Sequence, residues 1–154
     1  MKPIRISATA ISAADTARVF DALADGASWP SWSIFDSVEL ERPGQGTPHG
    51  VGAIRIFVTK VSRAREEVVE LIPGRRLSYI LLAGLPLRDY RAVVELESTP
   101  SGGTQITWSA SFFPKYWGTG WFWSVLLTRT LTTVSGQLAA AAQSQRSTAA
   151  VGAT

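Results

Sequence analysis

The chain contains no cysteine, and this absence excludes disulfide bonds, thiolate catalysis, iron–sulfur clusters and thiolate zinc sites. It contains a single histidine, which without neighbouring carboxylates supports neither a metal site nor a catalytic triad. No uninterrupted apolar run approaches the roughly 18 residues that a membrane-spanning helix needs. We therefore expect no metal, no covalent cofactor and no transmembrane segment. The lack of cysteine also favours the reducing cytoplasm as the location.

What the chain does contain is typical of one globular domain. Hydrophobic residues make up 45% of its 154 residues and charged residues 18%, a balance that excludes a disordered chain. The formal net charge is +3, but the lysines and arginines are dispersed along the sequence. Acidic residues interrupt the densest basic group, in the order Arg63, Arg65, Glu66, Glu67, Glu70, Arg75 and Arg76. This mixture predicts a solvated sheet face and no binding of nucleic acid.

Seven segments have the features of β-strands. Apolar and polar residues alternate in them, and glycine, proline or small polar residues bound them, at residues 4–9, 34–41, 51–60, 63–71, 75–83, 87–98 and 104–113. In the turn Ile72-Pro73-Gly74, proline fixes φ and glycine supplies a positive φ. Parallel strands need a long crossover, so the short turns from the third strand onward predict antiparallel pairing.

Two short helices and one long helix are predicted around these strands. Ser12 is expected to cap a first helix that ends near Gly26, and residues 29–32 are expected to form a single helical turn. From Thr119 to Gln143 the apolar residues follow helical spacing. Residues 144–154 are small and polar, so we expect a single domain over residues 1–143 followed by a flexible tail.

Alternation also sorts the side chains of the strands into two faces. One face is apolar and carries the aromatic residues Tyr79, Tyr90 and Trp108, together with the small residues Ala92 and Ala110. A buried tyrosine hydroxyl or indole N–H needs a hydrogen-bond partner, so these aromatics are natural orienting groups in an apolar pocket. Tyr90 is the leading candidate. A bulky residue at Ala92 or Ala110 is then expected to block binding while the fold survives.

Alternation does not decide which side of the sheet Arg55 and Glu70 occupy. If Arg55 shares the inner side with Phe57, it needs a partner such as Glu70 or a ligand carboxylate. The alternative is an arginine on the exposed side of its strand.

The lone histidine, His49, lies in a proline- and glycine-containing loop and is interpreted as a surface turn residue. The same loop begins Gly44-Gln45-Gly46, which is similar to the start of a phosphate-binding loop. However, His49 stands where the third glycine would be, and the loop precedes a strand where a helix would be needed. We therefore expect no nucleotide.

Five aromatic residues surround Gly118 and Gly120 where the last strand meets the long helix: Tyr116, Trp117, Trp121, Phe122 and Trp123. One helical stripe cannot bury all five. Those left over are expected to line or cap the mouth of a pocket, or to lie at a membrane or partner surface.

The order of these elements resembles the START-domain and polyketide cyclase (SRPBCC) superfamily, which has the helix-grip fold. The resemblance covers about residues 3–143 and is carried by residues 4–20, Trp29-Pro30-Ser31-Trp32, Gly50-Val51-Gly52, residues 66–73, Arg75-Arg76-Leu77-Ser78-Tyr79 and residues 102–108. It implies an α+β fold, with a curved seven-stranded antiparallel sheet wrapped round the C-terminal helix and two short helices after the first strand. It also implies a deep pocket for lipids, polyketides, hormones or other apolar molecules.

Three functions fit this expectation. The first is the binding, and so the carrying or shielding, of a hydrophobic small molecule such as a lipid or polyketide. The ligand-binding residues would be Tyr79, Tyr90, Trp108, Arg55, Phe57, Phe112, Trp32, Trp117, Trp121, Trp123 and Leu127. The second is a polyketide cyclase- or dehydratase-like enzyme, with Tyr90, Arg55, Glu70 or Asp89 as acid or base. The third is an interaction module with a filled interior.

The expected partner is a hydrophobic small molecule. Its entrance should lie near Trp32, Trp117 and Trp121, where transient contact with a membrane is allowed. The sequence leaves open the ligand, the oligomeric state and whether a reaction is catalysed.

Overall fold

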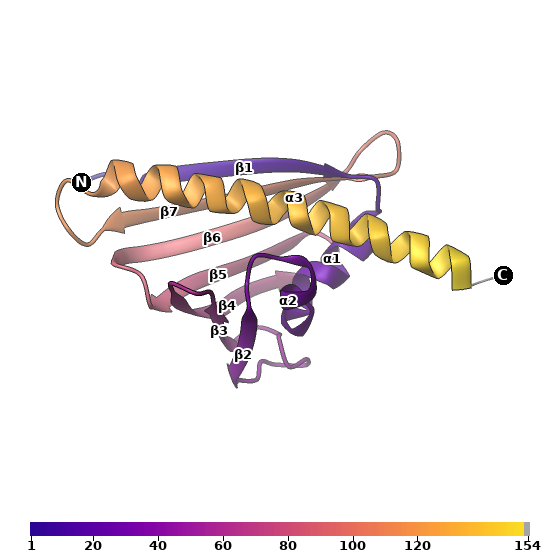
Figure 1. The fold of residues 1–154 in the computed structure, drawn as a ribbon, viewed down its shortest axis with the longest axis horizontal. Helices are drawn as coiled ribbons and strands as arrows, with labels where there is room; N and C mark the ends of the chain where they lie inside the picture. The colour runs from indigo at the N-terminus through magenta and orange to yellow at the C-terminus, as the bar shows by residue number, and fades with distance from the viewer. Residues whose placement is uncertain (153–154) are drawn as a thin grey trace.

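The fold consists of one antiparallel sheet that curves beside a long helix (Figure 1). A computed structural model describes the backbone of residues 1–152 and the side chains of residues 1–144. The strands are β1 (Ile4–Ser12), β2 (Ser37–Arg42), β3 (Ile54–Val58), β4 (Arg63–Ile72), β5 (Arg76–Ala83), β6 (Leu87–Ser98) and β7 (Thr104–Pro114). They form a seven-stranded sheet in the order β1-β7-β6-β5-β4-β3-β2, and all neighbours are antiparallel.

The helices follow the predicted order. After β1 come α1 (Thr16–Ala24), the 3-10 helix η1 (Gly26–Ser28) and the single turn α2 (Trp29–Trp32), and after β7 comes α3 (Gly120–Gly152). The predicted helix-grip architecture is confirmed. Among the described residues, no helix is both long enough and apolar enough to span a membrane.

Helix α3 lies along one flank of the sheet. It packs against β1, β7 and α1, while β2, β3 and β4 lie farther from it (Figure 1). Ser12 Oγ, at the end of β1, donates to the carbonyl oxygen of Ala139 in α3 at 2.8 Å. At the start of α3, Gly120 packs closely on β1, since a Cβ added there would come within 2.7 Å of Ile4 Cδ1 and the end of that side chain would have to move. The helix is therefore bound to the end of β1 and packs closely on its start.

The inner face of the sheet is the one that alternation predicts in β5, β6 and β7. Tyr79 pairs with Ala92, Val94 pairs with Trp108, and all four side chains are buried. Ala92 also pairs with Ala110, and both lie in the packed core. The register predicted for these three strands is therefore correct.

Three details of the predicted elements are wrong. Asp15 caps α1 by accepting the Arg18 N–H at 2.9 Å, and Ser12 instead ends β1. Helix α3 continues past Gln143 to Gly152, because the alanine-rich segment is a good helix former with no proline to stop it. Strands β2 and β3 begin later than predicted, and for β3 the reason is that residues 50–53 turn through Gly52 with φ 89°. The division into a domain and a flexible tail stays a prediction, and residues 153–154 lie outside the described part.

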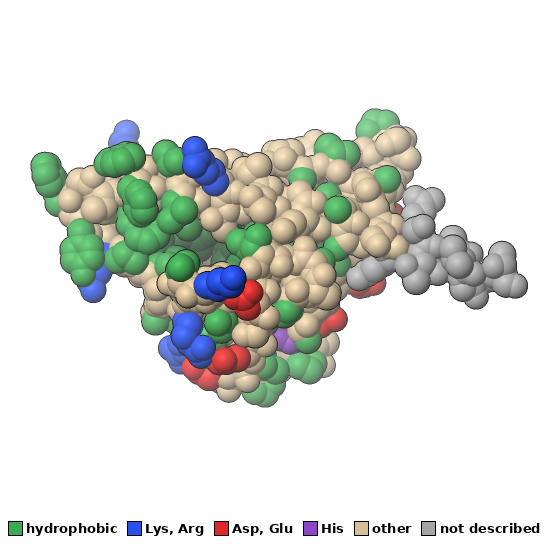
Figure 2. Space-filling model, viewed as in Figure 1, with side chains coloured by type: hydrophobic (Ala, Val, Ile, Leu, Met, Phe, Trp, Pro, Cys, Tyr) green, Lys and Arg blue, Asp and Glu red, His purple; other side chains and the backbone are tan. Residues whose placement is uncertain are grey.

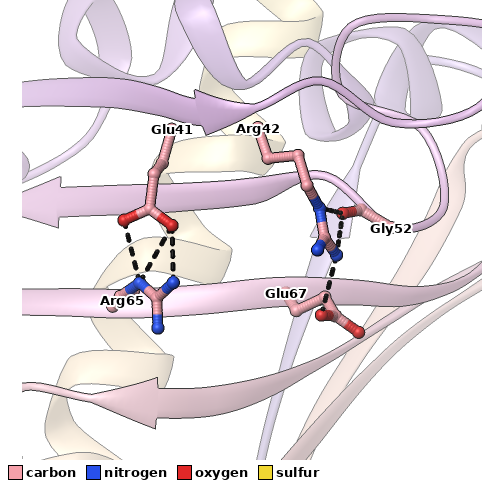
Figure 3. Close-up of polar contacts among 5 residues, drawn as sticks. All are labelled: Glu41, Arg42, Gly52, Arg65 and Glu67. Carbon is pink, nitrogen blue, oxygen red and sulfur yellow. Dashed lines mark hydrogen bonds and ion pairs between the residues drawn. The ribbon is translucent and has the colours of Figure 1, made fainter.

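The outer face of β2 to β4 carries charged pairs that join neighbouring strands (Figure 3). Arg65 binds Glu41 at 2.5 Å, and Arg42 binds both Glu67 at 3.1 Å and the carbonyl oxygen of Gly52 at 2.9 Å. Exposed pairs of this kind contribute little stability each, but they keep this face solvated. The pairing agrees with the prediction of a solvated sheet face.

Candidate ligand-binding cavity

A cavity of about 570 Å³ lies between the sheet and the first half of α3. The space-filling view shows the hollow, with hydrophobic side chains around it (Figure 2). Its wall takes residues from α2, from the segment before β2, from strands β3 to β7 and from α3 between Trp123 and Val134. This volume lies within the range of about 300–1,000 Å³ that small-molecule sites occupy.

One end of the cavity is closed by Trp29 of the short helix α2. Its buried indole lies 4.9 Å from the ring of Phe57 and 5.8 Å from that of Trp108. Its Nε1 donates to the carbonyl oxygen of Leu23 at 3.0 Å, which satisfies the indole N–H. Trp29 is therefore held rigidly and presents only an apolar surface to the cavity.

Polar groups converge on the cavity at Glu66, Tyr79 and Tyr90. Trp108 Nε1 donates to the Tyr79 hydroxyl at 3.1 Å, and the ring centres of Tyr79 and Tyr90 are 6.4 Å apart. Asp89 precedes Tyr90 at a β-bulge and has a left-handed φ of 51°, a conformation that aspartate tolerates better than most residues. The strand resumes its regular alternation at Tyr90, whose ring faces the cavity.

Burial favours the neutral form of each of these groups. Burial raises the pKa of Glu66 to about 8, and the nearby positive charge of Arg55 offsets only part of this effect. Burial also raises the pKa of Tyr79 and that of Tyr90, and the Glu66 charge adds to both shifts. The polar part of the cavity therefore offers two phenols and a protonated carboxyl to a ligand.

Arg55 lies on the inner side of β3 and is fully buried, whereas sequence reasoning left its side open. It pairs across the strands with Glu66, yet none of its three guanidinium nitrogens has a protein hydrogen-bond partner. Its Cζ lies 5.0 Å from the ring centre of Phe57 and 5.9 Å from that of Trp29. Burial lowers the pKa of Arg55, and Glu66 and then Tyr79 act in the opposite direction. A charged group therefore lies behind the aromatic end wall.

The suggested partner Glu70 lies on the other face of the sheet. Its carboxylate accepts from Ser78 Oγ at 3.1 Å and from Arg76 Nη1 at 3.4 Å. The acid opposite Arg55 is Glu66, which the sequence analysis treated only as part of a charged run. An irregularity in the register between Val68 and Glu70 causes this difference, because it moves Glu70 out of strict alternation.

The structure brings six of the eleven predicted ligand-binding residues into the cavity wall: Phe57, Tyr79, Tyr90, Trp108, Trp123 and Leu127. Phe112 is buried in the core and stacks on Tyr90 at 6.1 Å between ring centres. Trp32 is half-buried and packs on Trp29 at 5.1 Å. Trp117 and Trp121 are exposed and lie outside the wall.

Several wall residues were missed by sequence reasoning: Trp29, Phe35, Ala64, Glu66, Leu81, Leu131 and Val134. The helical stripe contains Leu131 and Val134, so their position could have been deduced. Ala92 and Ala110 are not in the wall, and a bulky residue there would overpack the core. The small residue that does line the cavity is Ala64.

His49 lies outside this cavity and is half-buried, so it is more than a surface turn residue. Its ring packs on Gly26, where an added Cβ would lie 2.4 Å from Nδ1. Burial and the charge of Arg55 lower the pKa of His49. Among the described side chains, no three histidine, aspartate or glutamate residues form a group that could hold a metal.

A comparison with protein families matches residues 3–143 to the family described as polyketide cyclase / dehydrase and lipid transport. A search of curated proteins finds no match.

Solved structures with the same fold include a START superfamily protein from Mycobacterium smegmatis. It has a TM-score of 0.77 and 14% identity, over 92% of this chain and 98% of that one. The Zhui aromatase/cyclase from Streptomyces sp. R1128 has a TM-score of 0.74 and 15% identity, over 92% of this chain and 94% of that one. A protein from Thermobifida fusca has a TM-score of 0.71 and 23% identity, over 88% and 90%. At these identities the likeness shows the fold alone.

Proposed function

Because the chain belongs to the polyketide cyclase / dehydrase and lipid transport family, we propose that it carries or shields an apolar small molecule, such as a lipid or polyketide. The molecule would occupy the cavity between the sheet and α3. The observation that supports this most strongly is the cavity itself, whose 570 Å³ lie under a mainly apolar wall with a few convergent polar groups. An interaction module with a filled interior would have no use for such a space.

The polar groups favour a ligand with an oxygen at one end. Trp108 donates to the Tyr79 hydroxyl, and the Tyr79 and Tyr90 hydroxyls share a hydrogen bond, so the two phenols together keep one hydroxyl proton for a ligand. The protonated Glu66 is a further donor beside them. A carbonyl or hydroxyl oxygen would satisfy these donors, whereas a purely hydrocarbon ligand would leave them unpaired.

Binding of Nile red, a neutral aromatic probe with a carbonyl group, tests the proposal by fluorescence titration. Ala64→Trp places a large ring in the cavity and should weaken binding at least about tenfold, because a tryptophan occupies much of the apolar space. Ala17→Trp adds the same ring at an exposed position of α1 and serves as the matched control. Equal affinity of the wild type and Ala64→Trp would contradict the proposal, provided that thermal unfolding shows both variants to be folded.

A second candidate is an enzyme that acts on a ligand in the same cavity, and Glu66 favours it. A carboxyl whose pKa is about 8 can accept and return a proton near neutral pH, which an ordinary glutamate does poorly. In its ionised form Glu66 could take a proton from the carbon between two carbonyl groups, and that carbon would then bond to a third carbonyl carbon of the same chain, whose oxygen takes the proton back from Glu66. Removal of the second proton from the same carbon and its return to the new hydroxyl would then release water and leave a carbon–carbon double bond. If so, Glu66→Gln should abolish cyclisation of a linear substrate that carries a 1,3-diketone and a third carbonyl group, and leave Nile red affinity within about threefold.

A further inference from the structure

The start of α3 and the connection before it expose six large hydrophobic side chains. These are Tyr116, Trp117, Trp121, Phe122, Val125 and Leu126, called here the aromatic patch. Trp117 is 96% exposed and Trp121 is 73% exposed. In Figure 2, hydrophobic side chains gather on the side of the molecule where α3 begins. Monomeric soluble proteins rarely leave a contiguous apolar surface of this kind uncovered, so the patch indicates a partner.

The aromatic patch is continuous with the mouth of the cavity. Residues 121, 122, 125 and 126 share one face of α3, while Trp123 and Leu127 on the adjacent face line the cavity. Leu126 belongs to both surfaces. Across the mouth, the β3–β4 turn places Val61 in the cavity wall with 94% of its surface exposed. A partner seated on the patch would therefore also cover the mouth.

The connection before α3 displays these rings in a defined geometry. Gly118 has a φ of 80°, which allows the chain to reverse after Trp117. Thr119 Oγ donates to the carbonyl oxygen of Tyr116 at 2.7 Å, and the Trp123 N–H donates to Thr119 at 3.2 Å. The exposed rings therefore extend from a hydrogen-bonded turn and the first turns of a helix.

The charges near the patch are mainly basic. Between residues 113 and 143 the charged residues are Lys115 and Arg129, and residues 1–9 contribute Lys2 and Arg5, with no acid in either segment. The start of β6, which pairs with the end of β7, adds Arg88 and one acid, Asp89. Lys115 Nζ lies 5.6 Å from the ring centre of Tyr116, so one cation is held at the edge of the patch. The cavity wall itself contains one lysine, Lys60, and the acids Asp36 and Glu66.

We propose that the aromatic patch docks the protein on the surface of a lipid bilayer that contains anionic lipids, with the cavity mouth facing the acyl chains. Tryptophan and tyrosine favour the membrane–water interface, because their rings have an apolar body and a polar edge. The flanking lysine and arginine residues complement anionic headgroups. A symmetric dimer through the same patch would bring Lys115 and Arg129 close to their own copies, which disfavours a second copy as the partner. Docking requires no bound ligand and so goes beyond the proposed function.

Vesicle co-flotation of the purified full chain tests the proposal. The wild type should float with vesicles of phosphatidylcholine containing about 30% phosphatidylglycerol, and bind pure phosphatidylcholine more weakly. The double variant W117A/W121A should bind at least about tenfold more weakly, since each ring removes a large apolar surface from the contact. K115E/R129E should weaken binding to the anionic vesicles by about fivefold or more per residue. A higher salt concentration should also weaken the binding of the wild type to these vesicles.

Ile11→Ala is the matched control, because Ile11 is also an exposed hydrophobic residue but lies at the other end of β1. It should bind vesicles as the wild type does. The proposal is overturned if the wild type does not float, or if W117A/W121A floats equally well. It is also overturned if sedimentation shows that the wild type is a dimer, that W117A/W121A is a monomer, and that the wild type does not bind vesicles. Because Nile red binding is measured without vesicles, failure here is separate from failure of the proposed function.

Discussion

Replacing Glu66 by glutamine should stabilise the protein at alkaline pH and leave its stability unchanged at acidic pH. In the folded state, burial raises the pKa of Glu66 from 4.5 to about 8. Between these two pH values the unfolded chain releases the Glu66 proton while the folded chain retains it. Each pH unit in this window therefore costs the folded state about 1.4 kcal/mol, and glutamine, which does not titrate, avoids this cost.

The size of the effect follows from the width of the window. The difference between 8 and 4.5 corresponds to at most about 5 kcal/mol above pH 8, for a carboxylate that stays dry. Glu66 lies in a cavity wall, where water can hydrate the carboxylate once it ionises, so we expect a plateau of about 2–5 kcal/mol. Below pH 4.5 both states hold the proton, and the variant should match the wild type.

Urea unfolding of both proteins at pH values from 4.5 to 9 measures this difference. Glu97→Gln, which removes an exposed carboxylate at the end of β6, is the control and should show no such rise. If the difference between E66Q and the wild type stays constant across the pH range, Glu66 is not a buried acid. If the wild type gains stability over E66Q as the pH rises, Glu66 is an ionised partner of Arg55.

Three further substitutions test other parts of the structure by urea unfolding. Arg55→Met should raise the free energy of unfolding by about 1–4 kcal/mol, because a buried charge without a hydrogen-bond partner is costly; a decrease would show that its contact with Phe57 outweighs that cost. Trp108→Phe should lower it by at least about 1 kcal/mol, since the Tyr79 hydroxyl loses its donor; an unchanged value would argue against that hydrogen bond. Asp15→Ala should cost about 1 kcal/mol through loss of the α1 cap, and no loss would mean that Asp15 is not the cap.

Much of the inner face of the sheet could be predicted, because apolar and polar residues alternate without interruption in the parts of β6 and β7 that form it. From Tyr90 to Leu96 each second residue of β6 is buried, and the bulge at Asp89 lies just before this stretch. In β4 the irregularity lies inside the apolar run. Counting by twos from Val68 places Glu70 inside, whereas the register places Leu71 inside, opposite Leu77. A single extra residue reverses the faces beyond it, which misplaces Glu70. Glu66 keeps the alternation with Val68, so the acid of the cavity could have been deduced once Val68 was placed on the inner side.

For the five aromatic residues at positions 116–123, the sequence limits the prediction in a different way. Its composition indicates that one helical stripe cannot bury all five rings, and two of them, Trp117 and Trp121, are in fact strongly exposed. Which ring faces the cavity depends on the rotation of α3 about its axis, and this is fixed by distant contacts such as Gly120 against Ile4 and Ser12 against Ala139. Such contacts join residues far apart in the chain and leave no local signal. Trp32, which was predicted near the entrance together with Trp117 and Trp121, packs on Trp29 and is not in the cavity wall, and the position of the entrance stays a prediction.

Native mass spectrometry of the protein mixed with a stoichiometric amount of Nile red tests most directly whether a ligand occupies the cavity. The wild type should retain one probe molecule, and Ala64→Trp should retain almost none, while Ala17→Trp behaves as the wild type does. A wild type that remains without probe, or an Ala64→Trp variant that retains it in equal proportion, would contradict the claim that the space between the sheet and α3 is a ligand-binding site.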